Sequence, residues 1–425
     1  MSDLIFHVDI NSCYVSCERL LNPALMGRPV VVLSNNDGCI VALSAEAKAL
    51  GYRMGEPWFK VQVRAAEQGV IACSSNYELY GDISQRVMEV LQQQAADFEQ
   101  YSIDEAFLTI PLKLDQARSQ ALSLKRQLAR RVGVPCCVGV AQTKTLAKLA
   151  NKTAKKVPAL GGVCLWEALP AERRRHLFKA LPVSEIWGVG SRTAARLEGM
   201  GIGSIEDLAQ APLELIRKKF SVLLMRTVLE LNGIKALELE PERRFKEQLI
   251  YSRAFSEPIE REEELRQVLS VYAQRAAGRL AKEGQLAGLL TAFCSTSPFR
   301  GGASHYPTVQ VKLPGKTADP LILTRAAQQL VERADFGAVA YVRAGVILLD
   351  LLPAHAHIPL DGLTYEYERR NIAGLLESVQ EKCGPAALGL GLAGFSRAAT
   401  WDMRREMLSH RGTTHWDELV SVRIG

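Results

Sequence analysis

No stretch of the sequence approaches the ~18 consecutive apolar residues that a membrane-spanning helix needs, so we expect no segment that crosses a bilayer. We also expect no signal region, because Asp3 and Asp9 bracket an apolar run that is too short for one. The nine cysteines are scattered, without a Cys-x-x-Cys pair or the Cys/His spacing of a zinc site, and Cys136-Cys137 lies in an apolar run. They indicate reduced core residues and a location in a reducing cytosol.

A strong charge imbalance is missing as well. The formal net charge is +6, which permits a polyanionic partner without requiring one. Apolar residues make up 48% of the sequence and charged residues 23%, a composition that favours a globular protein over a disordered one. Because 425 residues are too many for a single hydrophobic core, we expect three or four domains. We find no internal repeat.

Three carboxylates from distant parts of the sequence are the most informative feature that is present. Asp9 ends the apolar run 4–10, and Asp104 and Glu105 lie within the apolar run 101–110. Like charges that are gathered in one place repel each other unless cations neutralise them, and Mg²⁺ is usually held by carboxylates together with substrate phosphates. The three acids therefore predict metal-dependent phosphoryl or nucleotidyl transfer. The alternative is that one of them only caps a helix or a turn.

Residues 104 and 105 are neighbours, which sets a geometric condition. In an ideal strand, two neighbouring side chains point to opposite faces. Both carboxylates reach one site only if a turn or a bulge re-aims one of them. We therefore expect an irregularity in the backbone at this position.

The first 167 residues mix strands and helices without a regular βαβ rhythm, which predicts α+β packing with helices on one sheet face. We expect strands at 4–10, 29–33, 101–110 and 134–141, and helices at 11–21, 45–50, 84–94 and 143–156.

The last of these helices has a distinct basic face. At 100° per residue, its lysines fall within an arc of roughly 80°. They are Lys144, Lys148, Lys152 and Lys155. A lysine stripe is often only a solvated surface, but this one directly follows a strand of the predicted acidic sheet. That position favours contact with phosphate.

From about residue 168 the sequence changes to short helices with basic clusters. The segment Trp187-Gly188-Val189-Gly190 is typical of a helix-hairpin-helix, in which glycines let backbone N–H groups approach a phosphate. An ordinary helical hairpin with a glycine turn is an equally good interpretation of these residues alone.

The region after the charged segment 241–246, which we interpret as a linker, has a regular pattern. It predicts strand, helix, two strands, helix and strand, the βαββαβ order of ferredoxin-like domains. The expected elements are 248–255, 262–283, 288–295, 306–313, 319–334 and 340–350. The last ~70 residues are weakly patterned, and we expect a partner-binding or poorly ordered tail.

Several ordered motifs of this sequence resemble those of the Y-family DNA polymerases, and within that family the UmuC type. They are Asp9 with Asn11 and Tyr14, the turn 34–39, Glu46-Ala47-Lys48, Ser74-Ser75-Asn76-Tyr77, Tyr101-Ser102-Ile103-Asp104-Glu105 and the run 139–148. The resemblance extends over the whole chain and is strongest over residues 1–350.

The resemblance implies a multidomain α+β fold shaped as a right hand. It assigns a palm to 1–30 and 75–167, small fingers to 31–74, a helical thumb with the helix-hairpin-helix to 168–240, the ferredoxin-like βαββαβ little finger to 241–352, and the C-terminal tail to 353–425. The βαββαβ segment and the helix-hairpin-helix were placed from pattern, and they agree with this division.

The resemblance also implies roles for individual residues. Asp9, Asp104 and Glu105, with the Ile10 carbonyl, correspond to the ligands of two Mg²⁺ ions, which lie about 3.5–4 Å apart in such sites. Tyr14 corresponds to the steric gate that excludes a ribose 2′-hydroxyl.

Lys48 and Lys155 correspond to the contacts of the family with the triphosphate. Lys156 could serve in place of Lys155. Many relatives have a tyrosine at the position of Ala45, so we expect the Ser44 hydroxyl to supply that contact.

Backbone contacts to DNA are expected from the thumb and the little finger, where they position a duplex without reading its sequence. The candidates are Gly188, Gly190, Arg217, Lys218, Lys219, Lys312, Arg325 and Arg343. Each charge, taken alone, favours the interpretation as a solvated surface residue over that of a DNA contact.

The implied function is template-directed, error-prone DNA synthesis across lesions in the SOS response to DNA damage. Primer-template DNA and a dNTP are the substrates, and a UmuD'-like accessory dimer and the RecA filament are the implied partners. Relatives also carry a sliding-clamp motif, for which the nearest match is the degenerate segment 357–361, so clamp binding through it is doubtful. The alternatives are another palm-type two-metal enzyme, or a DNA-binding subunit without catalytic activity.

Overall fold

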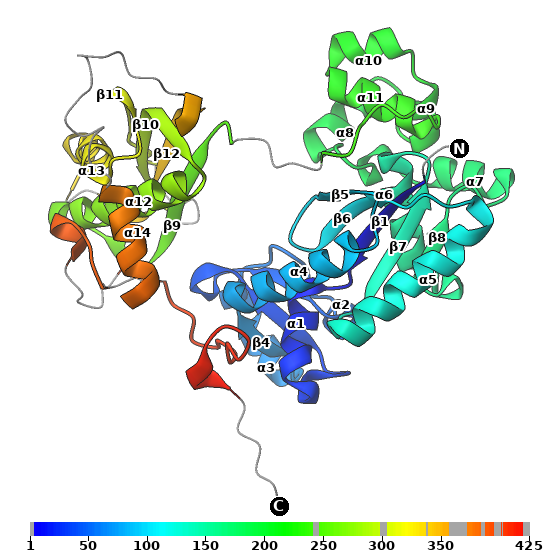
Figure 1. Cartoon of the computed structure of the whole chain (residues 1–425), viewed down its shortest axis with the longest axis horizontal. Coiled ribbons are helices and arrows are strands. Elements are labelled where there is room, and N and C mark those ends of the chain that lie inside the picture. Colours follow the sequence, from blue (N-terminus) through cyan, green and yellow to red (C-terminus); the bar gives the residue numbers. More distant parts are fainter. Residues whose placement is uncertain are drawn as a thin grey trace, which may run out of the picture. The chain divides into compact units, whose positions relative to one another are not determined.

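The structure is a computed structural model that describes residues 4–240, 246–297, 304–336, 339–356, 372–383, 387–394, 401 and 403–419. The chain forms two compact units, and each contains a hydrophobic core of its own (Figure 1). The first unit comprises Met1–Leu33, Ile40–Arg243 and Met407–Gly425, and the second comprises Ser34–Cys39 and Arg244–Glu406.

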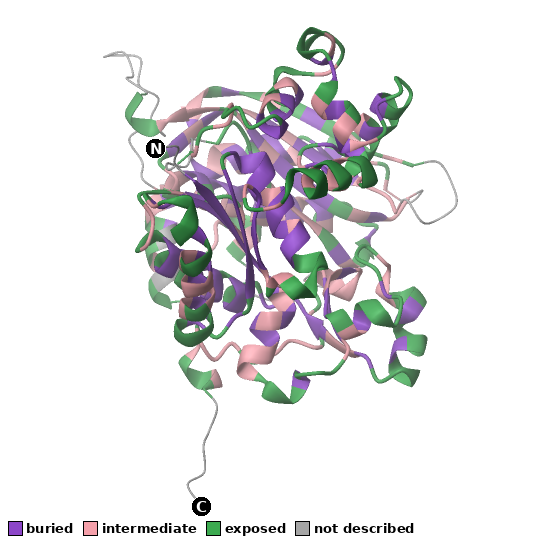
Figure 2. Ribbon diagram, turned by 90° about the vertical axis from the view of Figure 1, so that its right-hand side faces the viewer, coloured by how far each residue is buried: buried purple, intermediate pink, exposed green. Residues whose placement is uncertain are grey.

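A five-stranded sheet lies at the centre of the first unit, in the order β5-β6-β1-β7-β8. Its strands are β1 (Ile5–Ile10), β5 (Asp97–Gln100), β6 (Glu105–Thr109), β7 (Cys136–Ala141) and β8 (Val163–Leu165). All residues of β1 are buried, and β1 is antiparallel to both of its neighbours (Figure 2). A strand that is covered on both faces needs apolar residues throughout, which explains the nearly continuous apolar run at this position.

One face of this sheet packs against three helices. Phe6, Val8 and Ile10 of β1 point to this face, because side chains alternate along a strand, and they form a core with the apolar residues of the helices. The helices are α1 (Cys13–Leu21), α4 (Tyr77–Gln92) and α5 (Leu114–Arg131).

The opposite face packs against α6 (Lys144–Lys156), so that His7 and Asp9 of β1 face this helix. Gly139 of β7 allows the close approach of α6, because a Cβ at this residue would lie 2.1 Å from the carbonyl oxygen of Ala147. Asn151 of α6 then donates hydrogen bonds to the carbonyl oxygens of His7 and of Cys137, at 3.0 Å and 2.8 Å. The helix that carries the lysines is thereby fixed directly to the sheet.

A smaller sheet in the same unit has the order β3-β2-β4. It consists of β2 (Val30–Leu33), β3 (Ile40–Leu43) and β4 (Ile71–Ser74), which pack with α2 (Ala45–Ala49) and α3 (Trp58–Glu67). Because β4 is an edge strand of this sheet, its outer side can accept another segment of chain.

Short helices follow the large sheet and share a core with α6. They are α7 (Ala171–Ala180), α8 (Ser191–Glu198), α9 (Ile205–Gln210), α10 (Leu213–Lys219) and α11 (Val222–Leu231). The buried Glu230 of α11 accepts a hydrogen bond from the backbone N–H of Thr145, at 2.9 Å. This bond satisfies one of the free donors at the start of α6.

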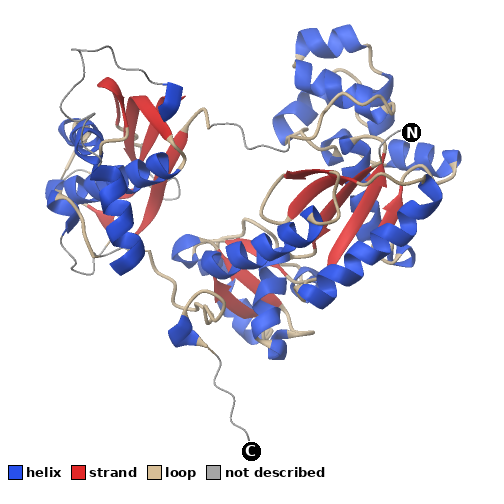
Figure 3. Cartoon of the chain, viewed as in Figure 1, coloured by secondary structure: helices blue, strands red, loops and turns tan. Residues whose placement is uncertain are grey.

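The second unit contains the predicted βαββαβ order, which is confirmed (Figure 3). Its elements are β9 (Leu249–Ile259), α12 (Glu262–Lys282), β10 (Gln285–Ser295), β11 (Thr308–Thr317), α13 (Pro320–Gln328) and β12 (Tyr341–Pro353). The sheet is antiparallel, in the order β11-β10-β12-β9. Each βαβ unit is therefore split by a strand of the other.

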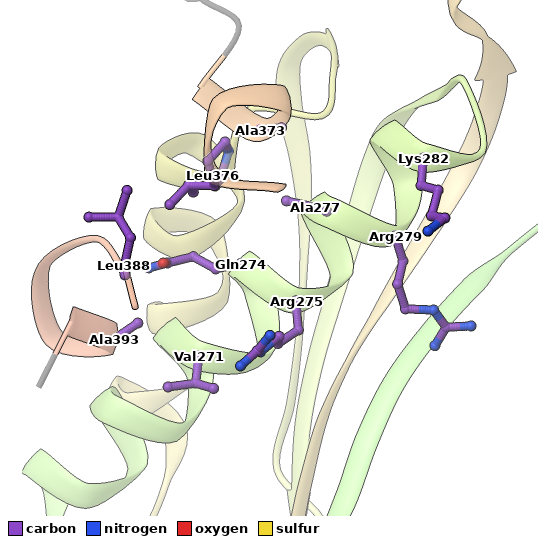
Figure 4. A pocket seen from close by; sticks show the side chains of 13 residues that line it. Val271, Gln274, Arg275, Ala277, Arg279, Lys282, Ala373, Leu376, Leu388 and Ala393 are labelled. Atoms are coloured by element: carbon purple, nitrogen blue, oxygen red, sulfur yellow. The ribbon is translucent and has the colours of Figure 1, made fainter. Parts of the chain in front are cut away.

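The C-terminal helix α14 (Ile372–Cys383) packs against α12 in the second unit. A cavity of about 210 Å³ remains between them, and the Gln274 side chain of α12 reaches across it to the backbone near Leu388 (Figure 4). Gln274 donates to the carbonyl oxygen of Leu390 and accepts from its N–H, both at 2.9 Å. Part of the tail is thus folded onto the second unit.

The cysteines, the helices and the predicted linker bear on three further expectations. All nine cysteines lie in the described part of the chain, where none forms a disulfide. No helix among the described residues is long and apolar enough to cross a membrane. The predicted linker falls largely on residues 241–245, which lie outside the described residues.

Candidate active site

Strand pairing brings two of the three predicted acids together. Asp9 on β1 is directly opposite Glu105 on β6 in the antiparallel register. Side chains of directly opposed residues lie on the same face, with Cβ atoms about 5 Å apart. Two carboxylates that are 96 positions apart in the sequence therefore meet on the face that packs against α6.

Asp104 lies in a turn immediately before β6, which is the irregularity that the sequence required. The Ser102 hydroxyl holds this turn, because it accepts hydrogen bonds from the backbone N–H groups of Asp104 and Glu105 and donates to Asp104 Oδ1 at 2.7 Å. The carbonyl oxygen of Asp104 accepts from the N–H of Ile10 at 2.9 Å. The turn is thus fastened to the end of β1, beside Asp9.

The lysines of α6 face these acids. Lys155 Nζ lies 2.5 Å from Asp9 Oδ1, and Lys148 Nζ lies 2.8 Å from Glu105 Oε2. The two ammonium groups offset the repulsion between the carboxylates. The lysine stripe is therefore an ion-paired surface, and the interpretation of it as merely solvated is wrong for these two residues.

The other lysines of this helix have separate partners. Lys144, which is buried, bonds both oxygens of Glu99, at 2.7 Å and 2.9 Å. Lys152 and Lys156 both pair with Glu185, the latter at 3.3 Å. Lys155 and Lys156, which the sequence left as alternatives, thus point to different carboxylates.

Burial raises the pKa of Asp9 from 3.8 to about 6, against the opposing effect of Lys155, and the nearby charges of Glu105 and Asp104 raise it further. The raised pKa therefore reflects mainly the burial of this carboxylate beneath α6, with a smaller contribution from the neighbouring anions. A divalent cation bound at this position would relieve the repulsion between them.

His7 is a site residue that the sequence analysis missed. It is buried, neither ring nitrogen has a hydrogen-bond partner in the described part of the chain, and Nε2 lies 3.8 Å from Glu105 Oε1. Burial lowers the pKa of His7 well below its ordinary value, and the charges of Lys148 and Lys155 lower it further. The ring is therefore neutral. The strand period of two, which places residues 7 and 9 on one face, would have identified it.

A cavity of about 370 Å³ opens beside these groups. It is lined by His7, Asp9, Glu105, Thr145, Lys148, Leu149, Asn151, Lys152, Lys155, Glu185, Ile186 and Trp187. Lys148 Nζ lies 4.2 Å from the ring centroid of Tyr101 and 5.0 Å from that of Trp187, and Trp187 donates a hydrogen bond to the Tyr101 hydroxyl at 2.9 Å. The cavity combines charged and aromatic groups, as ligand sites commonly do.

The donor set fits a hard divalent cation, because three carboxylates and a backbone carbonyl are oxygen ligands. Among the described residues, however, no three His, Cys, Asp or Glu side chains are already arranged to hold a metal ion. Lys148 and Lys155 occupy the carboxylates instead. A metal ion bound here would compete with these two ammonium groups for the carboxylate oxygens.

The residues expected at the nucleotide differ in their surroundings. Tyr14 is half-buried on α1, where its ring stacks on Tyr80 with a centroid separation of 4.4 Å. Lys48 on α2 is exposed and forms no ion pair with any described residue.

Ser44 does not fit its predicted contact with the triphosphate. It is 1% exposed, and its hydroxyl accepts the N–H groups of Val30 and Ala47, so it caps α2 and joins it to β2. This prediction is wrong, because the hydroxyl is already used inside the fold.

The candidates for DNA contact in the first unit lie on short helical elements. Gly188, with φ +85°, and Gly190 form the turn before α8, and a Cβ at either would meet open space. The three basic residues 217–219 are exposed at the end of α10. The glycine turn and the basic cluster are therefore accessible to a ligand.

The candidates in the second unit fall on two faces. Lys312 on β11 pairs with Leu289 of β10, whereas Arg343 on β12 pairs with Ser295. Both lie on the sheet face that is turned away from the helices. Arg325 lies on α13, which packs on the other face, so the structure does not bring it to the same surface. The degenerate clamp segment 357–361 lies outside the described residues.

The comparisons with solved structures identify the fold. A Y-family DNA polymerase chimera superposes with a TM-score of 0.66 over 82% of this chain and 99% of that chain, at 22% identity. DinB of Sulfolobus solfataricus gives 0.52 over 81% and 98%, also at 22% identity. The fold is the right-hand fold of the Y-family polymerases, which consists of palm, fingers, thumb and little finger.

The sequence comparisons identify the family. The impB/mucB/samB family matches residues 8–152, its C-terminal domain 246–360, and the helix-hairpin-helix motif of the family 171–202. The protein ImpB of Salmonella typhimurium is 41% identical over 98% of this chain and 99% of its own length, and UmuC of the same species is 40% identical over 98% and 99%. DNA polymerase IV 1 of Bacillus subtilis is 30% identical over 68% and 69%.

The chain therefore belongs to the impB/mucB/samB family, the UmuC type of the Y-family DNA polymerases. The helix-hairpin-helix interpretation of residues 187–190 is confirmed by the family motif that spans them. Residues 372–422 match a further domain whose function is not known.

Proposed function

We propose that this chain is a template-directed DNA polymerase that copies damaged templates with low fidelity, by two-metal nucleotidyl transfer in the SOS response. The observation that carries the proposal is the pairing of Asp9 with Glu105 across two strands, with Asp104 in the adjoining turn, opposite a row of lysines. Carboxylates that face lysines suit a reaction in which metal ions would take the place of the ammonium groups at the acids, and the ammonium groups would pair with the triphosphate.

Each group has a distinct task in this mechanism. Asp9, Asp104, Glu105 and the Ile10 carbonyl would hold two Mg²⁺ ions, which supply Lewis-acid stabilisation to the attacking 3′-oxygen and the departing pyrophosphate. Lys155, which lies 2.5 Å from Asp9, would contact the triphosphate as a compact charge. Lys48, exposed on α2, is the second candidate for this contact.

The choice of substrate follows from the surroundings of Tyr14. Its ring is held on the stack with Tyr80, and a rigid ring at the sugar would exclude a ribose 2′-hydroxyl. Low fidelity follows from the small fingers, because a closing motion that selects the correct base pair contributes little where the fingers are short. One solved relative is described as an insertion ternary complex of a DNA polymerase, at a TM-score of 0.53, which supports DNA and dNTP as substrates.

Extension of a labelled primer on undamaged and abasic templates tests the proposal. We expect Mg²⁺-dependent extension past the abasic site, no extension with EDTA, and a loss of about a hundredfold or more for Glu105→Gln. Glu67→Gln, at an exposed carboxylate that ends α3, should be as active as the unchanged chain. An active preparation of Glu105→Gln would remove the catalytic assignment, and failure on the abasic template alone would remove lesion bypass.

Partners follow from the family. We propose a UmuD'-like accessory dimer and the RecA filament as activators, and the sliding clamp as a weaker candidate because its motif is degenerate. The same primer-extension assay with and without each purified partner tests this. Equal activity in all mixtures would contradict it.

A further inference from the structure

The buried carboxylate of Glu18 connects Tyr14 with the C-terminal part of the chain. Tyr14 and Glu18 are one turn apart on α1 and therefore lie on one face of the helix. Tyr80 of α4 contacts both. Its ring stacks on Tyr14 at 4.4 Å with an interplanar angle of 15°, and its hydroxyl donates to Glu18 Oε1 at 2.6 Å. The position of the Tyr80 ring thus depends on Glu18, and the position of the Tyr14 ring depends on Tyr80.

Glu18 is 2% exposed, so its carboxylate depends on donors within the protein. Burial raises the pKa of Glu18 above its ordinary value, while hydrogen bonds from Tyr80 and Ser409 oppose the change. The Ser409 hydroxyl donates to Glu18 Oε1 at 3.1 Å. Among the described residues, Tyr80 and Ser409 are the side-chain donors to this carboxylate, and Ser409 lies 391 positions away in the sequence.

The C-terminal segment is docked by several bonds at this position. Met407 lies beside the edge strand β4, where it accepts from the backbone N–H of Ser74 at 3.0 Å and donates to the Ser74 hydroxyl at 2.9 Å. Two residues further on, Asn76 Nδ2 donates to Ser409 Oγ at 2.9 Å and to the Ser409 carbonyl oxygen at 3.2 Å. Ser409 is thereby oriented towards Glu18.

Further hydrogen bonds hold the docked segment, both at its contact with α4 and within the segment itself. Asn76 uses its oxygen to cap α4 through the N–H of Leu79, so the residue that orients Ser409 also begins the helix that carries Tyr80. Beyond Ser409, Arg411 and Glu418 close the segment on itself, with Arg411 Nε donating to Glu418 at 2.8 Å. The segment is thus an ordered part of the first unit.

We propose that the C-terminal segment Met407–Glu418 belongs to the nucleotide site, and that Ser409 acts through Glu18 and Tyr80 to position Tyr14 and so sets discrimination between deoxyribo- and ribonucleoside triphosphates. Ser409, Glu18 and Tyr80 are positioning residues, because in this proposal they act on the substrate only through Tyr14. This inference assigns a task to part of the region 372–422, whose family match has no known function, and it rests on the proposed gate at Tyr14.

The test measures kcat/KM for insertion of dCTP and of rCTP opposite dG in the full chain. Ser409→Ala and Tyr80→Phe each remove one donor to Glu18 and keep the remaining side chain. We expect each to lower the dCTP to rCTP ratio about threefold to tenfold, the range that one hydrogen bond supplies, with the larger change in the rCTP value. In the double variant, the fold reduction of this ratio should not exceed the product of the two single reductions, because both variants act through Glu18.

Thr414→Ala is the matched control. This residue is exposed on the same segment, and its hydroxyl bonds to the carbonyl oxygen of Arg411 and to Nδ1 of the neighbouring His415, away from Glu18, so its ratio should equal that of the unchanged chain. Ser409→Thr keeps the hydroxyl and should also retain the ratio. Thermal melting of every variant separates a change of gate from a loss of fold, and Tyr80→Phe tests the same connection if Ser409→Ala is unstable.

Tyr14→Ala separates this inference from the proposed function. An unchanged ratio in Tyr14→Ala would remove the gate and this inference with it. A collapsed ratio in Tyr14→Ala, together with unchanged ratios in folded Ser409→Ala and Tyr80→Phe, would overturn the positioning role of the C-terminal segment and leave the gate intact. Lowered ratios in all three support the whole connection.

Discussion

Lys155 and Lys156 leave the same turn of α6, yet they differ in what they can do for a nucleotide. Lys155 is paired with Asp9 at 2.5 Å, inside the cavity, whereas Lys156 is 59% exposed and pairs with Glu185 at 3.3 Å. A lysine that neutralises Asp9 within this cavity is well placed to neutralise a phosphate of a bound nucleotide.

We therefore expect Lys155→Ala to raise KM for dNTP about tenfold or more, as the loss of one charge-assisted contact predicts, and Lys156→Ala to leave KM unchanged. Steady-state insertion of a single nucleotide measures both values. A larger effect in Lys156→Ala would exchange the two assignments.

Glu18 gives a prediction that depends on pH. Its pKa in the folded protein is raised above 4.5, so protonation favours the folded state and the stability that it contributes falls as pH rises through 4.5 towards the folded value. Glu18→Gln has no such titration. Its Tm relative to that of the unchanged chain should therefore rise between about pH 4 and the folded pKa, and then level off. A Tm difference that is constant over this range would show that folding does not raise the pKa of the Glu18 carboxyl.

Among the elements, α6 depends most on a single small residue. A Cβ at residue 139 would lie 2.1 Å from the carbonyl oxygen of Ala147 and 2.2 Å from the backbone nitrogen of Asn151, and backbone atoms cannot give way without moving the helix. Gly139→Ala should therefore push α6 from the sheet, cost about 1–3 kcal/mol in the free energy of unfolding, and lower kcat by misplacing Lys148 and Lys155.

Chemical denaturation and primer extension measure the two effects. Gly81→Ala is the control, because a Cβ at this helical residue meets nothing within 4 Å and the change should be neutral or stabilising. Normal activity in a stable Gly139→Ala protein would mean that α6 tolerates a shift.

The elements also show what the sequence could reveal. The βαββαβ order was predictable because period-two alternation in β11 and long amphipathic helices are local signals. The turn at Asp104 followed from strand geometry. The partners of the lysines were not predictable, because Lys148 and Lys155 contact acids 43 and 146 positions away.

The docking of the C-terminal segment was not predictable for the same reason. Met407 and Ser409 carry no local signal, and their partners lie more than 330 positions earlier in the chain. Ser44 shows the opposite failure. Its residue type suited a phosphate contact, but a serine before a helix is first a cap, and its hydroxyl was already in use.

At the scale of the whole molecule, the response to salt measures how many phosphates the chain neutralises. The net charge of +6 is modest, so DNA affinity must come from local basic surfaces. Affinity for primer-template DNA should fall steeply with salt, with a slope of about −0.9 for each phosphate contact. A flat response would contradict a protein that tracks a duplex.

Two basic residues allow this slope to be dissected. Lys312 and Arg343 lie on the face of the second unit's sheet that no described helix covers, whereas Arg325 lies on α13, which packs on the opposite face. Lys312→Gln with Arg343→Gln should reduce the slope by up to about 2, and Arg325→Gln should leave it unchanged. Fluorescence anisotropy over a salt series measures the slopes, and melting curves test Arg343→Gln because Arg343 also donates to Ser252 at 2.8 Å. An equal reduction by Arg325→Gln would place the DNA along the helices instead of the open sheet.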